Sequence, residues 1–400
     1  MSPSRVSTHR YQHVLVSGSP FERGRQHGSQ ASTKIHFNIS KYKSLSSMPS
    51  QTIIDRYVRD YYIPAITAEF PRGLEEMKGL AEGAMTSLEE IVMLNARYDL
   101  SRHVRSEQGP SECTSMSLIT KPADGEGGDV FVAQNWDISP WLHDNDTIIV
   151  LHSIDPSSND VNQPCSTIAL TEAGQLARSG MNSLGIAVCA NSLWSTQDYF
   201  PVMDEASLKP VLPVSLSRRM VLECGNIGQA LRTVSRMSRH TSNNLMIGCK
   251  TGIAVDVELT PYDAFIIHPD TIETAAGPLQ LLTHANHFVS PAMLSRSDVK
   301  EGYGGGSSSY RDKRLYQRLA QSAGASHGSL TFNDIQHAFK DHAGFPESVC
   351  EHATSNSTSV TVACVVYDLN RLEMHVSTGN PCLDAWDTYR LDVKQDAKKP

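Results

Sequence analysis

Hydrophobic residues recur at two different spacings along this chain, and the change comes near residue 110. In the first part, apolar residues behind Pro71 follow the helical period: Leu74, Met77, Leu80 and Ala81. Ser87 and Glu90 form a capping-box pattern that predicts another helix from Leu88 to Leu100. We therefore predict a short strand over 13–17, followed by helices from Pro20 to about residue 100.

Beyond residue 113 the pattern becomes that of short β-branched strands. Strands are predicted over 115–120, 130–134, 147–152, 166–171, 185–190, 253–259, 360–368 and 372–377. Helical spacing returns over 215–222, 227–237, 312–320 and 332–339. The turn-forming cluster 122–128 predicts a hairpin between the first two strands, and the Gly/Ser-rich stretch 302–309 predicts a flexible insertion. This order of elements favours a layered α+β fold over a parallel Rossmann plan.

Composition narrows the class of protein. The 400 residues are 40% hydrophobic and 20% charged, which is typical of a globular enzyme. A net charge of −8 argues against a nucleic-acid partner, because phosphate binding needs a basic face. The sequence has no apolar run that predicts a signal peptide or a membrane span, and it ends in Ala-Lys-Lys-Pro instead of a peroxisomal tripeptide. We therefore expect a cytoplasmic protein with no membrane partner.

Eight cysteines are scattered along the chain, at positions 113, 165, 189, 224, 249, 350, 364 and 382. No two have C-x-x-C spacing, so the sequence predicts free thiols and no metal site. His284 and His287 have a spacing that could serve a metal, but no third ligand follows at a convincing distance. We therefore expect no bound cofactor.

Cys113 lies where the helical pattern gives way to strands, among the small hydroxyl residues Ser111, Thr114 and Ser115. A thiol at the mouth of a strand is a candidate nucleophile, provided that it is activated. The alternative is a small buried hydrophobic residue.

Two polar groups could assist this thiol. The run Gln134–Asp137 ends the second strand of the predicted hairpin, although a turn acid that caps its own backbone has the same pattern. Asn286 offers an amide that could stabilise an oxyanion. Two glycine-flanked blocks, 171–174 and 180–187, are typical of a hairpin that needs positive φ.

Seven blocks occur in an order that resembles the fungal isopenicillin N acyltransferase (acyl-CoA:6-aminopenicillanate acyltransferase) family of N-terminal-nucleophile hydrolases. They are Ser19–Gly24 with His27–Gly28, Glu90–Arg97, Cys113–Thr114, Gln134–Asp137, Thr171–Gly174, Asn182–Ala187 and His284–His287. The likeness extends from about residue 13 to 392, and the order of the blocks makes it specific.

The resemblance implies a four-layer αββα sandwich that is made as an inactive precursor. The chain would cut itself between Glu112 and Cys113, and fragments 1–112 and 113–400 would remain together as a heterodimer. Cys113 would then be the nucleophile, with its own α-amine as general base. By the resemblance, Asp137 supports this cysteine and Asn286 forms the oxyanion hole. Asn135, Ser357 and Thr358 are further candidates for supporting the site.

The resemblance further implies an acyltransferase or amidohydrolase of specialised metabolism, such as antibiotic biosynthesis. Its partners would be a small acyl donor, with acyl-CoA as co-substrate, and an amine acceptor. Two differences from the penicillin enzyme matter. Glu112 replaces a glycine before the cysteine, which predicts slower cleavage, and Ser357-Thr358 replaces Ser-Arg, which predicts altered recognition of a substrate acid. The alternatives are a plain amidase that uses water, and a silent homologue that keeps the fold as a binding or assembly protein.

Overall fold

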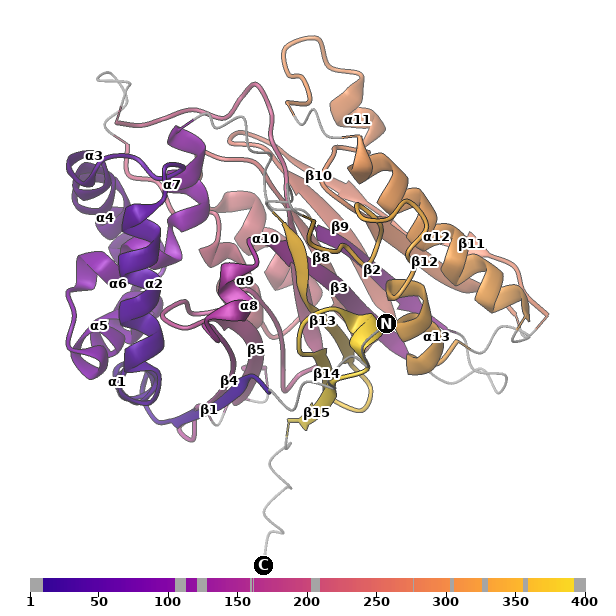
Figure 1. Cartoon of the computed structure of the whole chain (residues 1–400), viewed down its shortest axis with the longest axis horizontal. Helices are drawn as coiled ribbons and strands as arrows, with labels where there is room; N and C mark the ends of the chain where they lie inside the picture. The colour runs from indigo at the N-terminus through magenta and orange to yellow at the C-terminus, as the bar shows by residue number, and fades with distance from the viewer. Residues whose placement is uncertain are drawn as a thin grey trace, which may run out of the picture.

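Two mostly antiparallel β-sheets lie face to face in this computed structural model, and helices cover their outer faces (Figure 1). The structure describes residues 10–104, 113–120, 128–158, 160, 162–202, 209–275, 277–302, 306–325, 330–354 and 359–391. Among these residues, no helix is long and apolar enough to cross a lipid bilayer.

The first sheet has eight strands, in the order β1 (Gln12–Ser17), β4 (Ile148–Ile154), β5 (Ser166–Glu172), β6 (Ser179–Asn182), β7 (Ile186–Ser192), β8 (Asn243–Cys249), β9 (Ile253–Leu259) and β10 (Ala264–Ile267). The second has seven strands, in the order β11 (Asp270–Ile272), β12 (Leu279–His284), β2 (Cys113–Ile119), β3 (Val130–Ile138), β13 (Val360–Asp368), β14 (Glu373–Ser377) and β15 (Trp386–Arg390). Only β1 and β4 pair in parallel within the described residues, which joins the start of the chain to a later segment.

Most helices lie on the side of the first sheet. Those of the N-terminal part are α1 (Pro20–Gln30), α2 (Ser32–Ser44), α3 (Gln51–Arg56), the π-helix η1 (Tyr57–Tyr62), α4 (Ile63–Glu69), α5 (Pro71–Ala84), α6 (Leu88–Asn95) and α7 (Arg97–His103). The later ones are α8 (Trp141–Asp144), α9 (Leu216–Leu222), α10 (Ile227–Arg236), α11 (Pro291–Leu294), α12 (Ser307–Ala325), α13 (Phe332–Phe339) and the 3-10 helix η2 (Pro381–Leu383). Helices α12 and α13 cover the second sheet instead (Figure 1).

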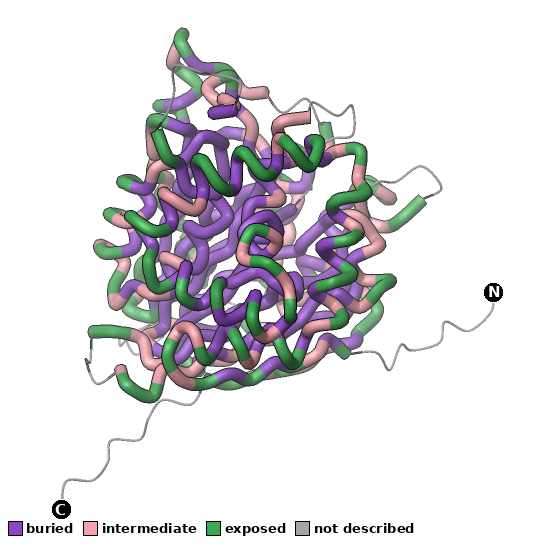
Figure 2. The backbone as a smooth tube through the Cα atoms, turned by 90° about the vertical axis from the view of Figure 1, so that its left-hand side faces the viewer, coloured by how far each residue is buried: buried purple, intermediate pink, exposed green. Residues whose placement is uncertain are grey.

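Successive side chains of a strand point to opposite faces of the sheet, and this alternation explains the layers. On β3, Val132 and Trp136 face the first sheet and pack with residues such as Ile168, whereas Phe131 and Ala133 face α12 and α13. A central strand such as β3 is therefore buried on both faces, as strands between two layers must be. Figure 2 shows the same arrangement, with buried backbone in the centre and exposed turns outside. The predicted α+β fold with four αββα layers is confirmed.

Helices α1 and α5 touch backbone to backbone, and glycines permit this contact. A Cβ atom on Gly24 would lie 1.9 Å from the carbonyl oxygen of Glu76, and one on Gly79 would lie 1.9 Å from that of Phe21. Neither distance is sterically possible. The glycines of the block that begins at Ser19 therefore serve helix packing.

Most predicted elements are present, including the capping box of Ser87 and Glu90 and the hairpin of β2 and β3. The hairpin glycines Gly174 and Gly185 have the predicted positive φ, of 97° and 78°. The prediction of a flexible insertion is wrong for 307–309, because these serines form the first turn of α12. There, the Ser308 hydroxyl is buried and accepts a hydrogen bond from the Asn286 backbone, which fixes this turn.

Candidate active site

Cys113 is the first residue of β2 and pairs with Trp136 of β3. Its side chain is buried and belongs to the hydrophobic core between the two sheets. The thiol is nevertheless surrounded by polar groups that sequence-distant elements bring to it, which distinguishes it from an ordinary core cysteine.

Three atoms of Cys113 are held by hydrogen bonds. Its backbone N–H donates to Asn286 Oδ1 over 2.8 Å, and Arg178 Nη2 donates to its sulfur over 3.0 Å. Its carbonyl oxygen accepts from Arg311 Nη1 over 2.8 Å and from Asn191 Nδ2 over 3.3 Å. Hydrogen bonds therefore fix the nitrogen, the sulfur and the carbonyl oxygen of Cys113.

Positive charges around the Cys113 thiol counteract the effect of burial on its pKa. Burial raises the pKa of the Cys113 thiol above its usual value, and the carboxylate of Asp137 adds to this rise. The positive charges of Arg178 and Arg311 and a hydrogen bond from the Asp137 backbone lower the pKa. Arg178 is the largest of these stabilising influences, so it is the group that best favours a thiolate here.

Asp137 and Asn286, the two predicted partners, both reach the neighbourhood of Cys113. Asp137 lies in β3 and its Oδ1 accepts a hydrogen bond of 2.5 Å from Thr361 Oγ1 of β13. Asn286 follows β12, and Arg311 Nη2 donates to its Oδ1 over 3.0 Å. Its Nδ2 donates to the carbonyl oxygen of Ser192. Asn286 therefore fixes the nitrogen of Cys113 in this structure.

Asn135 faces the other side of the sheet. Its amide donates to the carbonyl oxygens of Phe339 and Val349, which places it under α13 and away from the thiol. It holds a loop behind the site. The remaining predicted residues, Glu112, Ser357 and Thr358, lie outside the described residues.

A cationic cavity adjoins the thiol. Its lining includes Arg97, Arg178, Arg218 and Trp136. Burial lowers the pKa of Arg218 to about 9, and repulsion from the other two arginines adds to this effect. Glu172 pairs with Arg97 over 2.7 Å and offsets part of the charge. The excess positive charge suits an anionic group of a substrate.

Trp136 also lines this cavity, and its indole carries a hydrogen-bond donor. Trp136 is 1% exposed, and its N–H has no hydrogen-bond partner within the described part of the chain. A buried donor without a partner costs free energy, which a bound acceptor would recover. The cavity thus combines cations with an unsatisfied donor, and both favour a carboxylate or carbonyl oxygen.

Sequence reasoning missed Arg178, Asn191, Arg311 and Thr361. Arg178 lies between the two glycine-flanked blocks that were singled out, so its place in that hairpin was a usable signal. Arg311 lies in α12, which begins inside the predicted flexible insertion. Because 307–309 were predicted to be flexible, Arg311 was not considered as a site residue.

His284 and His287 do not form a metal pair in this structure. His284 Nε2 bonds Glu258 Oε1 over 3.0 Å, and His287 bonds Ser308. Burial disfavours the charged form of His284, but Asp256 and Glu258 outweigh this effect and raise its pKa to about 10. A buried ion pair therefore anchors the segment that carries Asn286.

Known proteins resemble this chain over most of its length. Residues 124–382 match the family described as acyl-coenzyme A:6-aminopenicillanic acid acyl-transferase. Over 379 residues the chain is 26% identical to the Emericella nidulans protein called acyl-coenzyme A:6-aminopenicillanic-acid-acyltransferase 40 kDa form, covering 92% of this chain and 93% of the relative.

Two solved structures are also similar. A variant of conjugated bile acid hydrolase from Clostridium perfringens is 11% identical, with a TM-score of 0.42, and the match covers 71% of this chain and 100% of that one. Penicillin V acylase from Agrobacterium tumefaciens is 15% identical, with a TM-score of 0.40, and the match covers 66% and 83%.

Proposed function

The chain belongs to the acyl-coenzyme A:6-aminopenicillanic acid acyl-transferase family, and from this premise we propose a self-processing cysteine acyltransferase or amidohydrolase. It forms or breaks an amide bond through a thioester on Cys113. One observation carries the assignment of the nucleophile: the Cys113 sulfur lies 3.0 Å from Arg178 Nη2 while its nitrogen lies 2.8 Å from Asn286 Oδ1. Thiol and nitrogen are thus held at once, as self-processing requires.

The first reaction is cleavage of the chain before Cys113. The thiol attacks the carbonyl carbon of Glu112, the C–N bond breaks, and the nitrogen takes a proton to become an amine. The acyl group is then a thioester on sulfur, and water hydrolyses it to a carboxylate and a free thiol. Arg178 favours the attacking thiolate, and Asn286 keeps the leaving nitrogen in place through its amide oxygen.

The second reaction uses the α-amine that cleavage releases. An α-amine has a pKa near 8, so it can accept the thiol proton near neutral pH. Because Asn286 accepts a hydrogen bond from this nitrogen, the amine would stay beside its own sulfur. The thiolate attacks the acyl carbon of the donor, whose acyl–sulfur bond breaks, and the donor's thiol leaves with the proton held by the α-amine. An amine or water then attacks the Cys113 thioester, and the Cys113 sulfur leaves as the free thiol. Asp137 supports the site through its backbone N–H to the sulfur. One N–H of the Asn286 amide donates to Ser192, and its second N–H would be the donor to the oxyanion.

The charges that line the cavity beside the thiol support a proposal for the substrate class. Arg178 and Arg218 are each 5% exposed, and such buried cations call for an anionic partner. We therefore propose a substrate with a carboxylate near the reacting amine, acyl-CoA as the acyl donor, and a role in specialised metabolism. The family description and the name of the relative from Emericella nidulans support acyl-CoA as donor.

The two fragments would remain together after cleavage. Strand β1 of the first fragment pairs along its whole length with β4 of the second. The largest core cluster also joins the N-terminal helices to Ile149 and Leu151 of β4. Separating the fragments would expose this core, so a heterodimer of 1–112 and 113–400 is expected.

Intact-mass analysis tests the proposal. Purified wild-type protein should give two masses that meet between Glu112 and Cys113, and Cys113→Ala should give one uncut chain. Cys189→Ala is the matched control, because Cys189 is equally buried on the facing sheet and should not affect cleavage. Incubation with acyl-CoA thioesters should add an acyl group to Cys113. An uncut wild-type chain that gains no acyl group would identify the silent binding homologue instead.

Product analysis separates transferase from amidase. With acyl-CoA and 6-aminopenicillanate as probes, a transferase gives the amide, whereas an amidase gives only the free acid. Arg218→Gln should raise KM for an amine that carries a carboxylate and leave KM for its methyl ester unchanged, because the ester lacks the charge that the cavity binds.

A further inference from the structure

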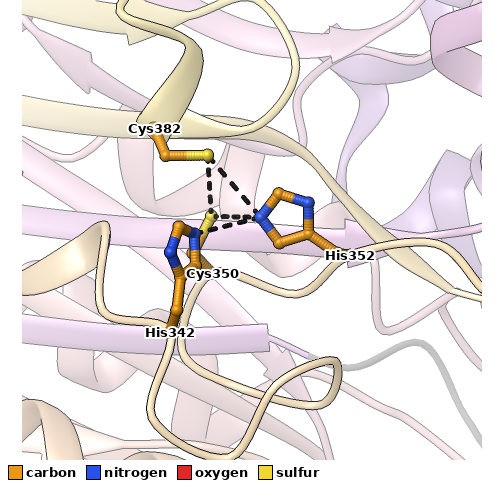
Figure 3. A group of neighbouring side chains, drawn as sticks. All are labelled: His342, Cys350, His352 and Cys382. Atoms are coloured by element: carbon orange, nitrogen blue, oxygen red, sulfur yellow. Dashed lines mark hydrogen bonds between the residues drawn. The ribbon is translucent and has the colours of Figure 1, made fainter. Parts of the chain in front are cut away.

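Four metal-ligating side chains meet at a place that is separate from the cavity beside Cys113. His342, Cys350 and His352 lie in the loop between α13 and β13, and Cys382 lies in η2. Figure 3 shows the two imidazole rings and the two sulfur atoms turned toward one another. The four ligand atoms all lie within 4.8 Å of each other. We propose that they form a structural zinc site that ties this loop to η2.

Three of the six distances between the ligand atoms match those of a tetrahedron around zinc. Zn–S bonds of about 2.3 Å and Zn–N bonds of about 2.0 Å give edges of about 3.8 Å between sulfurs, about 3.5 Å between sulfur and nitrogen, and about 3.3 Å between nitrogens. The two sulfurs are 3.8 Å apart. His352 Nε2 lies 3.5 Å from Cys350 Sγ and 3.6 Å from Cys382 Sγ.

The two histidines need only a small adjustment. Their Nε2 atoms are 3.0 Å apart, which is about 0.3 Å shorter than the tetrahedral edge. His342 is exposed and can rotate outward by this amount. Its exposure also provides the path by which an ion would enter.

Ligand chemistry selects the metal. Two thiolates and two imidazoles suit a borderline-soft cation such as Zn²⁺ and fill all four of its positions. Because no position stays open for water or substrate, the site is structural and not catalytic. Both cysteines are free, and their sulfurs are much farther apart than the roughly 2.05 Å of a disulfide bond.

A neighbouring side chain supports the ligands. Asn380 Nδ2 lies 3.5 Å from Cys350 Sγ and donates to the carbonyl oxygen of Glu351 over 2.7 Å. Such a donor orients a thiolate ligand and stabilises its charge. Cys350 is buried and His352 is half-buried, so water is largely kept from the sulfurs.

The position of the site connects it with Asp137. Glu351 lies between two of the ligands, and its backbone N–H donates to Thr361 Oγ1 over 2.9 Å. Thr361 in turn donates to Asp137, the neighbour of the Cys113 thiol. A metal ion would therefore fix the loop that holds Thr361 against Asp137. This consequence rests on the proposed function, whereas the metal site itself does not.

Metal analysis of the full chain tests the proposal. Protein purified in the presence of Zn²⁺ should carry one zinc ion per chain, and Cys350→Ser and Cys382→Ser should each lose it. Cys165→Ser is the matched control, because Cys165 is a half-buried free cysteine outside the cluster and should leave the zinc content unchanged. His342→Asn replaces the exposed ligand, so it tests the site even if a cysteine variant fails to fold.

Cobalt provides a spectroscopic test. Co²⁺ added to the chelator-treated chain should give the intense visible bands of a tetrahedral ion with thiolate ligands, and these bands should be absent in Cys382→Ser. Chelation should lower the Tm of the wild type and leave that of the variant unchanged. The proposal is overturned if the wild type holds no more zinc than Cys382→Ser, or if its mass shows a disulfide between Cys350 and Cys382. Because these measurements use no substrate, they stand or fall independently of the proposed function.

Discussion

Replacing Arg178 by glutamine should weaken the Cys113 nucleophile in a measurable way. The guanidinium donates to the sulfur over 3.0 Å, and both side chains are buried. A hydrogen bond to a charged group contributes about 1.5–3 kcal/mol, and one pKa unit corresponds to about 1.4 kcal/mol. Arg178→Gln should therefore raise the pKa of Cys113 further, and the loss of this free energy lowers the thiolate fraction about 10- to 100-fold near neutral pH.

The assay is the rate at which iodoacetamide alkylates Cys113, followed by mass spectrometry as a function of pH. Arg178→Lys keeps the positive charge and should give a smaller shift in the pH midpoint. Arg218 lines the same cavity without contacting the sulfur. Arg218→Gln should therefore also shift the pH midpoint only slightly. Thermal unfolding of each variant checks the fold. A pH midpoint for Arg178→Gln that equals the wild-type value, in a folded protein, would refute the role of Arg178.

Three further predictions concern packing, support and pH. Gly24→Ala would put a Cβ atom 1.9 Å from a carbonyl oxygen of α5 and should cost at least about 1–3 kcal/mol of stability, whereas Gly324→Ala in open space on α12 should be neutral or slightly stabilising by thermal unfolding. Thr361→Val removes the hydroxyl that donates to Asp137 and should lower stability by about 1–3 kcal/mol and slow self-cleavage; unchanged cleavage kinetics would contradict a supporting role. The folded-state pKa of His284 is raised from 6.5 to about 10, so its contribution to stability is complete below pH 6.5 and is lost as the pH rises through about 10. His284→Gln should flatten the decline of Tm over this range, and an equal slope in both proteins would contradict this assignment.

Local patterns in the sequence predicted most helices and strands, because the residues in these patterns themselves favour the helix or strand in which they lie. The capping residue Ser87, paired with Glu90 three positions later, starts a helix without help from distant parts of the chain. β-branched runs predicted most strands for the same reason. The strands β8, β10, β11, β12 and β15 were missed. Asn243 and Asn244 begin β8, and the polar Gln280 interrupts the apolar run of β12.

The site was only partly predictable, because its geometry depends on tertiary contacts. Cys113, Asp137 and Asn286 were candidates from local residue patterns, and the resemblance gave them roles. Arg178 instead approaches the thiol from the loop between β5 and β6 of the facing sheet, 65 residues later in the chain. The four proposed zinc ligands were missed for the same reason. Cys350 and Cys382 lie 32 residues apart, and only the packing of η2 against the loop after α13 brings them together. The expectation of no metal site rested on the absence of short cysteine spacings.

The parallel pairing of β1 with β4 bears on the order of events during maturation. A polypeptide that started at Cys113 and was synthesised alone would present β4 as a bare edge, ready to pair with other molecules and aggregate. The covalent link to the leading segment keeps the missing strand at high local concentration until the sheet is complete. If the chain cuts itself as proposed, the N-terminal segment would act as an intramolecular chaperone, and cleavage before Cys113 would have to follow completion of the sheet.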